Sequence, residues 1–167
     1  MADAIKYGGG AVKLAEALAL RADAARRVEQ LRARIVANAR YQEGEEPAED
    51  ARALLAEAGT VLDEFEVLIR RINRTNAAAR IDGDGTITDA LARRDVLRSR
   101  HAVTTAAADA AAGRSQHGAV RQLRSELKML AALPVARLRA QADGLAREIR
   151  DLDMRIQRAN WEVDLLE

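Results

Sequence analysis

Apolar residues in the last third of the chain recur at alternating spacings of four and three. They are Leu138, Ala142, Leu145, Ile149, Leu152, Ile156, Ala159, Val163 and Leu166. A helix with this spacing carries one narrow apolar stripe, which is buried only when it packs against another helix. The chain is therefore expected to fold as a helical bundle with coiled-coil-like seams.

Similar spacings predict three earlier helices, over residues 12–41, 48–73 and 88–112, with the last helix running over 134–166. Their apolar faces are Leu14, Ala17, Leu20, Ala24, Val28, Leu31 and Ile35; then Leu54, Ala58, Val61, Phe65, Leu68 and Ile72; then Leu91, Leu97, His101, Thr104, Ala108 and Ala111. Because short connections favour antiparallel neighbours, the predicted fold class is all-α, built from two antiparallel hairpins of long helices.

We interpret residues 13–167 as a single helical-bundle domain. Residues 1–12 contain three consecutive glycines and are expected to be a flexible N-terminal extension.

The connections are less regular than the helices. Asp82-Gly83-Asp84-Gly85 predicts a tight turn, and Thr88 has the chemistry of an N-cap for the third helix. A short β-ribbon is an option for residues 79–88. Residues 113–118 are expected to be loop, and residues 125–131 fit either a helix or a short strand.

Composition argues against several classes of protein. Aromatic residues make up 2% of the chain and charged residues 32%, with a net charge of +1, so there is no basic excess of the kind that marks a nucleic-acid binder. The chain has no cysteine and no apolar run near the roughly 20 residues that span a bilayer. Residues 1–11 lack an apolar signal core, which favours the cytoplasm. Local ion pairs are expected between Asp23 and Arg27, Glu66 and Arg70, and Asp151 and Arg155.

The Asp82–Gly85 turn resembles the middle of an EF-hand calcium loop. With Gly85 at the sharp-turn position, the leading carboxylate position is occupied by Arg80 and the closing glutamate position by Leu91. A cation therefore replaces the first carboxylate, and the bidentate ligand is missing. The sequence predicts a glycine-rich structural turn in preference to a calcium site.

The segment between the first two helices is acidic. Glu43, Glu45 and Glu46 precede Glu49 and Asp50 there. Such a cluster suits either a solvated helix entrance or contact with a basic partner or divalent cation, and we favour the first interpretation.

Polar residues also gather where the second helix is predicted to end. Asn73, Arg74 and Asn76 are candidates for fixing the following loop, for a subunit contact or for a ligand contact. His101 is expected to be a packed or interfacial histidine, since His101 and His117 are too few for a zinc site.

Four strings resemble a family of small, functionally uncharacterised bacterial helical proteins labelled septicolysin. They are Gln42–Asp50 (QEGEEPAED), Arg71–Asn76 (RINRTN), Thr88–Leu97 (TDALARRDVL) and Leu152–Trp161 (LDMRIQRANW). The resemblance runs from about Lys13 to Trp161 and implies a helical fold. Its label implies membrane activity, but it brings no catalytic residues with it.

Taken together, these patterns predict a cytoplasmic, non-catalytic structural or interaction protein that assembles into a homo-oligomer, with no cofactor and no metal. Narrow seams, few aromatic residues and many alanines suggest that the core is completed by another copy. Two alternatives stay open: association with nucleic acid through arginines, and the membrane activity that the septicolysin label implies. A ligand site shared between subunits would draw on Glu45, Asn73, Arg74 and His101.

Overall fold

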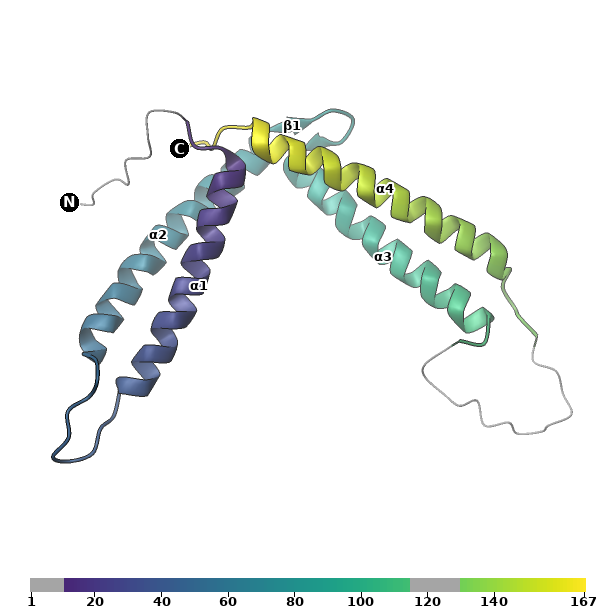
Figure 1. Ribbon diagram of the computed structural model, residues 1–167. Coiled ribbons are helices and arrows are strands. Elements are labelled where there is room, and N and C mark those ends of the chain that lie inside the picture. Colours follow the sequence, from purple (N-terminus) through teal and green to yellow (C-terminus); the bar gives the residue numbers. More distant parts are fainter. Residues whose placement is uncertain (1–10, 115–129) are drawn as a thin grey trace, which may run out of the picture. The chain divides into compact units, whose positions relative to one another are not determined.

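The computed structural model describes residues 11–114 and 130–167. These residues form four helices, α1 (Leu14–Asn38), α2 (Ala51–Ala78), α3 (Ile87–Ala111) and α4 (Val135–Glu162). A two-stranded ribbon, β1 (Arg80–Ile81) and β2 (Gly85–Thr86), lies between α2 and α3 (Figure 1). The all-α prediction is confirmed, and the ribbon falls within the segment where a ribbon was an option.

The chain divides into two compact units. The first comprises the chain up to Arg80 together with Gln157–Glu167, and the second comprises Ile81–Ile156. The prediction of one helical-bundle domain over 13–167 stays a prediction. Within the described residues, no helix is long and apolar enough to cross a membrane.

The first unit contains an antiparallel hairpin of α1 and α2. Its core is a cluster of buried apolar residues, with half-buried neighbours packed against it. The buried members are Leu31, Leu54, Ala58 and Val61, and the half-buried ones are Ala24, Val28 and Ile35. Arg34 pairs with Glu49, whereas Arg27, seven residues earlier, pairs with Glu57, eight residues later. The two segments therefore run antiparallel. Every residue of the two predicted stripes is buried or half-buried.

Both ends of α2 differ from the prediction. The helix begins at Ala51 because Asp50 is its N-cap, with a carboxylate that accepts the backbone N–H groups of Arg52 (2.8 Å) and Ala53 (3.2 Å). The predicted end at Asn73 is wrong, since the helix continues to Ala78. Its last turns are stabilised by contacts with the C-terminal residues of the chain, which outweigh the weak helix propensity of Asn and Thr.

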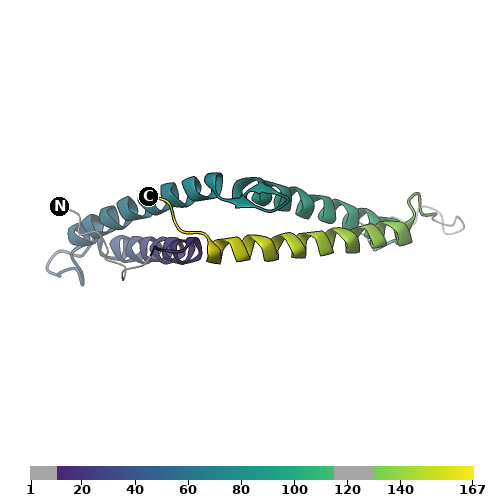
Figure 2. The same ribbon diagram turned by 90° about the horizontal axis from the view of Figure 1, so that it is seen from above.

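The second unit contains the hairpin of α3 and α4, which lie side by side along their lengths (Figure 1, Figure 2). Its buried apolar residues are Ile87, Ala90, Leu97 and Ala108 from α3, and Ala142, Leu145, Leu152 and Ile156 from α4. Asp153 links the two helices, with one carboxylate oxygen 3.1 Å from Nη2 of Arg98 and the other 3.8 Å from Nη1 of Arg94.

Helix α4 starts as predicted, directly after Pro134, but it ends at Glu162 and not at Leu166. Once the chain leaves the helix the period of the seam is lost, so Leu165 is buried and Leu166 is exposed. Most of the predicted loop over 113–118, and the 125–131 segment except its last two residues, lie outside the described residues, as do residues 1–10 of the predicted N-terminal extension.

Candidate functional site

The turn between β1 and β2 encloses the carboxylate of Asp84 completely, with 0% of the side chain exposed. The guanidinium group of Arg93, on α3, contacts one oxygen. Nη2 of Arg155, on α4, lies 2.7 Å from the other as an ion pair without hydrogen-bond geometry. An enclosed carboxylate is stable only when its charge is compensated. Asp84 therefore holds the turn against both helices of its hairpin.

The remaining residues of the turn have structural roles as well. Gly83 and Gly85 have φ values of 80° and 79°, which non-glycine residues rarely adopt. Thr86 is the N-cap of α3: its hydroxyl accepts the N–H of Asp89 (3.1 Å), and Asp89 accepts the N–H of Thr86 (2.9 Å). The predicted N-cap, Thr88, is wrong because the helix begins one residue before it. Asp84 thus pairs with two arginines, whereas the aspartate at this position of an EF-hand loop would bind a calcium ion.

The string Arg71–Asn76 lies inside the last turns of α2, where it binds the C-terminal segment (residues 163–167). Thr75 is fully buried, and its hydroxyl accepts the N–H of Leu166 (2.9 Å) while donating to the carbonyl of Arg71 (2.8 Å). Arg71 donates to the carbonyl of Leu166 and Arg74 to that of Glu167, each at 3.0 Å. Arg74, a candidate for fixing a following loop, for a subunit contact or for a ligand contact, thus contacts a distant part of its own chain.

The C-terminal segment also binds the start of α1. The N–H of Leu14 donates to the carbonyl of Val163 (2.9 Å), and the N–H of Leu165 donates to that of Val12 (2.8 Å). Nζ of Lys13 lies 2.6 Å from a carboxylate oxygen of Asp164. The first unit is thus held together by backbone and side-chain bonds between segments that are far apart in the sequence.

The candidate site residues in this unit lie in two separate places. Glu43, Glu45 and Glu46 are exposed in the connection between α1 and α2. Asn73 is exposed and Asn76 half-buried at the opposite end of α2, about 30 Å away along the helix at 1.5 Å per residue. The acidic cluster and the polar string therefore do not share a site within the first unit.

Glu49 is separated from the rest of the acidic cluster by its bonds. The single Nε–H of Arg34 is shared between the two carboxylate oxygens of Glu49, at 3.1 and 3.0 Å, and the backbone N–H of Glu49 donates to the side-chain oxygen of Asn38 (3.1 Å). The hydrogen bond from Arg34 holds the pKa of Glu49 below its ordinary value, and the same bond raises the pKa of Arg34. This pair fixes the end of the α1–α2 connection against the last turns of α1.

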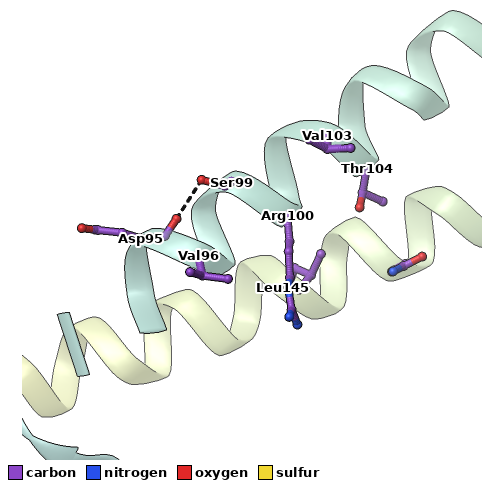
Figure 3. Close-up of a pocket in the computed structure, with 8 residues that line it drawn as sticks. Asp95, Val96, Ser99, Arg100, Val103, Thr104 and Leu145 are labelled. Carbon is purple, nitrogen blue, oxygen red and sulfur yellow. Dashed lines mark hydrogen bonds between the residues drawn. The ribbon is translucent and has the colours of Figure 1, made fainter. Parts of the chain in front are cut away.

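His101 is half-buried on α3, on the predicted stripe, in the second unit. Near it, α3 and α4 border an open groove of about 550 Å³. Its lining residues are Asp95, Val96, Ser99, Arg100, Val103, Thr104, Gln141 and Leu145 (Figure 3). The groove mixes apolar and polar side chains and was not predicted from the sequence.

Several charged residues that were expected to pair locally have distant partners instead. Glu66 and Arg70 pair as predicted, at 3.7 Å. Arg27 instead pairs with Glu57, at 2.8 Å, and Arg155 pairs with Asp84. Among the described residues, no three His, Cys, Asp or Glu side chains are grouped closely enough to hold a metal ion.

The chain belongs to a family of unknown function, DUF6847, whose model matches residues 21–165. Among solved structures it is similar to one described as a functionally unknown conserved protein from Corynebacterium diphtheriae. That chain is 37% identical, with a TM-score of 0.84, and the match covers 94% of this chain and 100% of the other. No functionally curated protein matches.

These comparisons correct the resemblance drawn from the four strings. They place the chain among helical proteins of unknown function, and nothing in them supports a septicolysin label. The strings instead mark structural contacts: Glu49, Thr75, Arg93 and Arg155 each come from a different string and each makes a contact described above.

Proposed function

We propose that the protein is a cytoplasmic, non-catalytic interaction protein that assembles into a homo-oligomer. The observation that carries the proposal is the exposure of large apolar side chains on the outer faces of the hairpins. Leu55 and Leu62 on α2 are 62% and 47% exposed, and Val96 and Val103 on α3 are 52% and 70% exposed. Each pair is spaced by seven residues, so both of its members lie on one face of the helix.

A hairpin of two helices buries one stripe on each helix, and these residues lie outside the buried stripes. Exposed apolar residues that recur on one helix face are typical of surfaces that bind another protein. Burying them against a second copy would remove apolar area from water without using any reactive group. Most oligomers of soluble proteins are closed, symmetric assemblies of identical chains, which is the form that we expect here.

The arrangement of charge favours a protein partner over nucleic acid. Arg27, Arg34, Arg93, Arg98 and Arg155 all pair with carboxylates of their own unit. Nucleic-acid binding relies on cations that are free to contact phosphates. These arginines instead contribute to the fold.

Native mass spectrometry and sedimentation equilibrium on the untagged chain test the proposal. We expect a discrete oligomer whose population rises with concentration, with a Kd of about 10 µM, which corresponds to about −7 kcal/mol. A chain that stays monomeric at about 100 µM, ten times that Kd, would refute self-assembly. A bound nucleotide, metal or small molecule in the measured mass would contradict the non-catalytic part of the proposal.

A further inference from the structure

Helix α3 carries a second stripe with the spacing of a coiled coil, and this stripe faces solvent. We call it the α3 seam; it consists of Ala92, Val96, Ser99, Val103, Ala106 and Ala110, at successive spacings of four, three, four, three and four. All six residues are exposed. At 100° per residue the α3 seam lies about 170° around the helix from the buried residues of α3. Helix α3 can therefore contact α4 on one face and a further helix on the other.

The α3 seam contains no charged residue, and its one polar side chain already has a partner. The hydroxyl of Ser99 donates to the carbonyl of Asp95 at 3.0 Å (Figure 3). Burial of the seam would therefore leave no hydroxyl donor unpaired. The comparable stripe on α2, through Leu55 and Leu62, is interrupted by Glu66 and so is less suited to burial.

The charges that flank the α3 seam indicate which helix fits it. Asp95 lies on one flank, and Arg93 and Arg100 lie on the other. When two such helices pair in parallel and in register, opposite flanks meet, and Asp95 of each copy lies near Arg100 of the other. In an antiparallel pair, equivalent flanks meet and the arginines approach each other. The charge pattern is therefore complementary to itself only in parallel.

Within the described residues, neither Arg100 nor the carboxylate of Asp95 is bound to another helix. None of the hydrogen bonds and ion pairs among the described residues involves the guanidinium group of Arg100, whose side chain lines the same groove as Leu145 of α4. Asp95 contacts its neighbour Arg94 at 3.2 Å, and such an exposed pair contributes little to stability. Figure 3 shows Asp95, Val96, Arg100 and Val103 on neighbouring turns of α3.

We propose that the α3 seam binds the α3 seam of a second copy, parallel and in register, in a two-fold symmetric dimer. This inference rests on the proposed function, because it names the partner and geometry of that self-assembly. Alternating valine with alanine and serine allows the two helices to approach closely, and β-branched residues at one set of seam positions favour pairs of helices. A seam this short supports a weak dimer, not a permanent one.

Disulfide cross-linking tests the orientation, because the chain has no cysteine of its own. We expect Val96→Cys and Ala110→Cys each to form covalent dimers under mild oxidation, since identical positions face each other in a parallel pair. Leu62→Cys, at an equally exposed apolar position on α2, is the control and should stay monomeric on a reducing-agent-free gel. In an antiparallel pair, at most one of the two seam positions can face itself. Efficient cross-linking at only one of them, or at Leu62→Cys instead, would overturn the inference.

Charge exchange tests the register. We expect Asp95→Arg and Arg100→Asp each to weaken dimerisation about 5- to 30-fold, because the two-fold axis repeats the repulsion, and the double variant to recover to within about threefold. A mixture of the two single variants should form heterodimers. Unchanged helical circular dichroism would show that each variant still folds. If the wild type dimerises while neither single variant weakens it, the α3 seam is not the interface and the proposed function survives; a monomeric wild type refutes both.

Discussion

Replacing Thr75 with valine isolates the bond that joins α2 to the C-terminal segment. Thr75 is fully buried, and its hydroxyl accepts the N–H of Leu166 at 2.9 Å and donates to the carbonyl of Arg71 at 2.8 Å. Valine has nearly the same shape and the same branching at Cβ, so packing and helix propensity change little. The substitution therefore removes the hydrogen bonds and leaves the volume in place.

The expected cost follows from the groups that are left behind. The carbonyl of Arg71 lies within α2 and keeps its place in the helical hydrogen-bonding pattern, so removing the donor hydroxyl of Thr75 costs little stability at this carbonyl. The N–H of Leu166 loses its acceptor, and an unpaired buried donor costs about 1–3 kcal/mol. Because the side chain of Leu166 is 45% exposed, water can reach this segment when it loosens. We therefore expect the free energy of unfolding to fall by about 1–2 kcal/mol.

Urea denaturation followed by circular dichroism measures the total change, and amide hydrogen exchange measures the local one. The amide of Leu166 should exchange faster in Thr75→Val. Thr75→Ser is the matched control: it keeps the hydroxyl and loses one methyl group, which costs about 1 kcal/mol while leaving the Leu166 amide protected. A valine variant with wild-type stability and wild-type exchange at Leu166 would refute the assigned role of this bond.

Three further substitutions test other contacts. Asp84→Ala should lower the free energy of unfolding by about 1–3 kcal/mol in urea, because it strands two arginines that are only half-exposed; an unchanged midpoint would contradict this. Gly85→Ala should lower the melting temperature, since φ is +79° and the added Cβ would lie 2.7 Å from the carboxylate of Asp89. In the Arg34–Glu49 pair, the hydrogen bond lowers the pKa of Glu49 in the folded state. The pair therefore stabilises the fold at pH values above the ordinary pKa of glutamate, and this stabilisation is lost as the pH falls through the lowered pKa of Glu49. Arg34→Gln should therefore lose less stability on acidification than the wild type in urea titrations at a series of pH values, and equal losses would contradict the pairing.

The buried stripes could be predicted because helical periodicity depends only on the chain itself. The residues from Leu14 to Ile35 and from Leu138 to Val163 that were assigned to stripes are all buried or half-buried. The third stripe was incomplete, since it omitted Ile87 and Ala90, both almost fully buried. Those two residues lie in or next to the capping turn, where the predicted N-cap was placed two residues too late.

Helix ends were predicted less accurately than the buried stripes, because distant residues determine where a helix ends. The polar string that contains Thr75 suggests the end of a helix when it is read locally. In the fold it is held in helical conformation by Leu166, 91 positions later. Likewise, the seam of α4 predicted burial at Leu166, and the chain leaves the helix first and buries Leu165. No local pattern contains this information.

The candidate site residues stay a prediction, and a related physical reason explains why their side chains are a weak guide to a site. Carboxylates and arginines are the side chains that suggest a site in this sequence, and here many of them neutralise one another across the hairpins. Asp84 shows this most clearly, because its charge is compensated by Arg93 on α3 and by Arg155, far along the sequence on α4. A residue that is needed to balance a buried charge is not free to bind a ligand, however suggestive its neighbours are.

The α3 seam has no reactive groups, but the spacing of its uncharged residues is visible in the sequence. A helix that packs against one neighbour needs one apolar stripe, whereas α3 has two uncharged stripes on nearly opposite faces. Helix α4 can cover only one of them. A second stripe that is free of charge for about five turns, with acid on one flank and arginine on the other, indicates a second helical neighbour. Among the described residues that neighbour is not supplied by α3's own hairpin, and the charge pattern fits another α3.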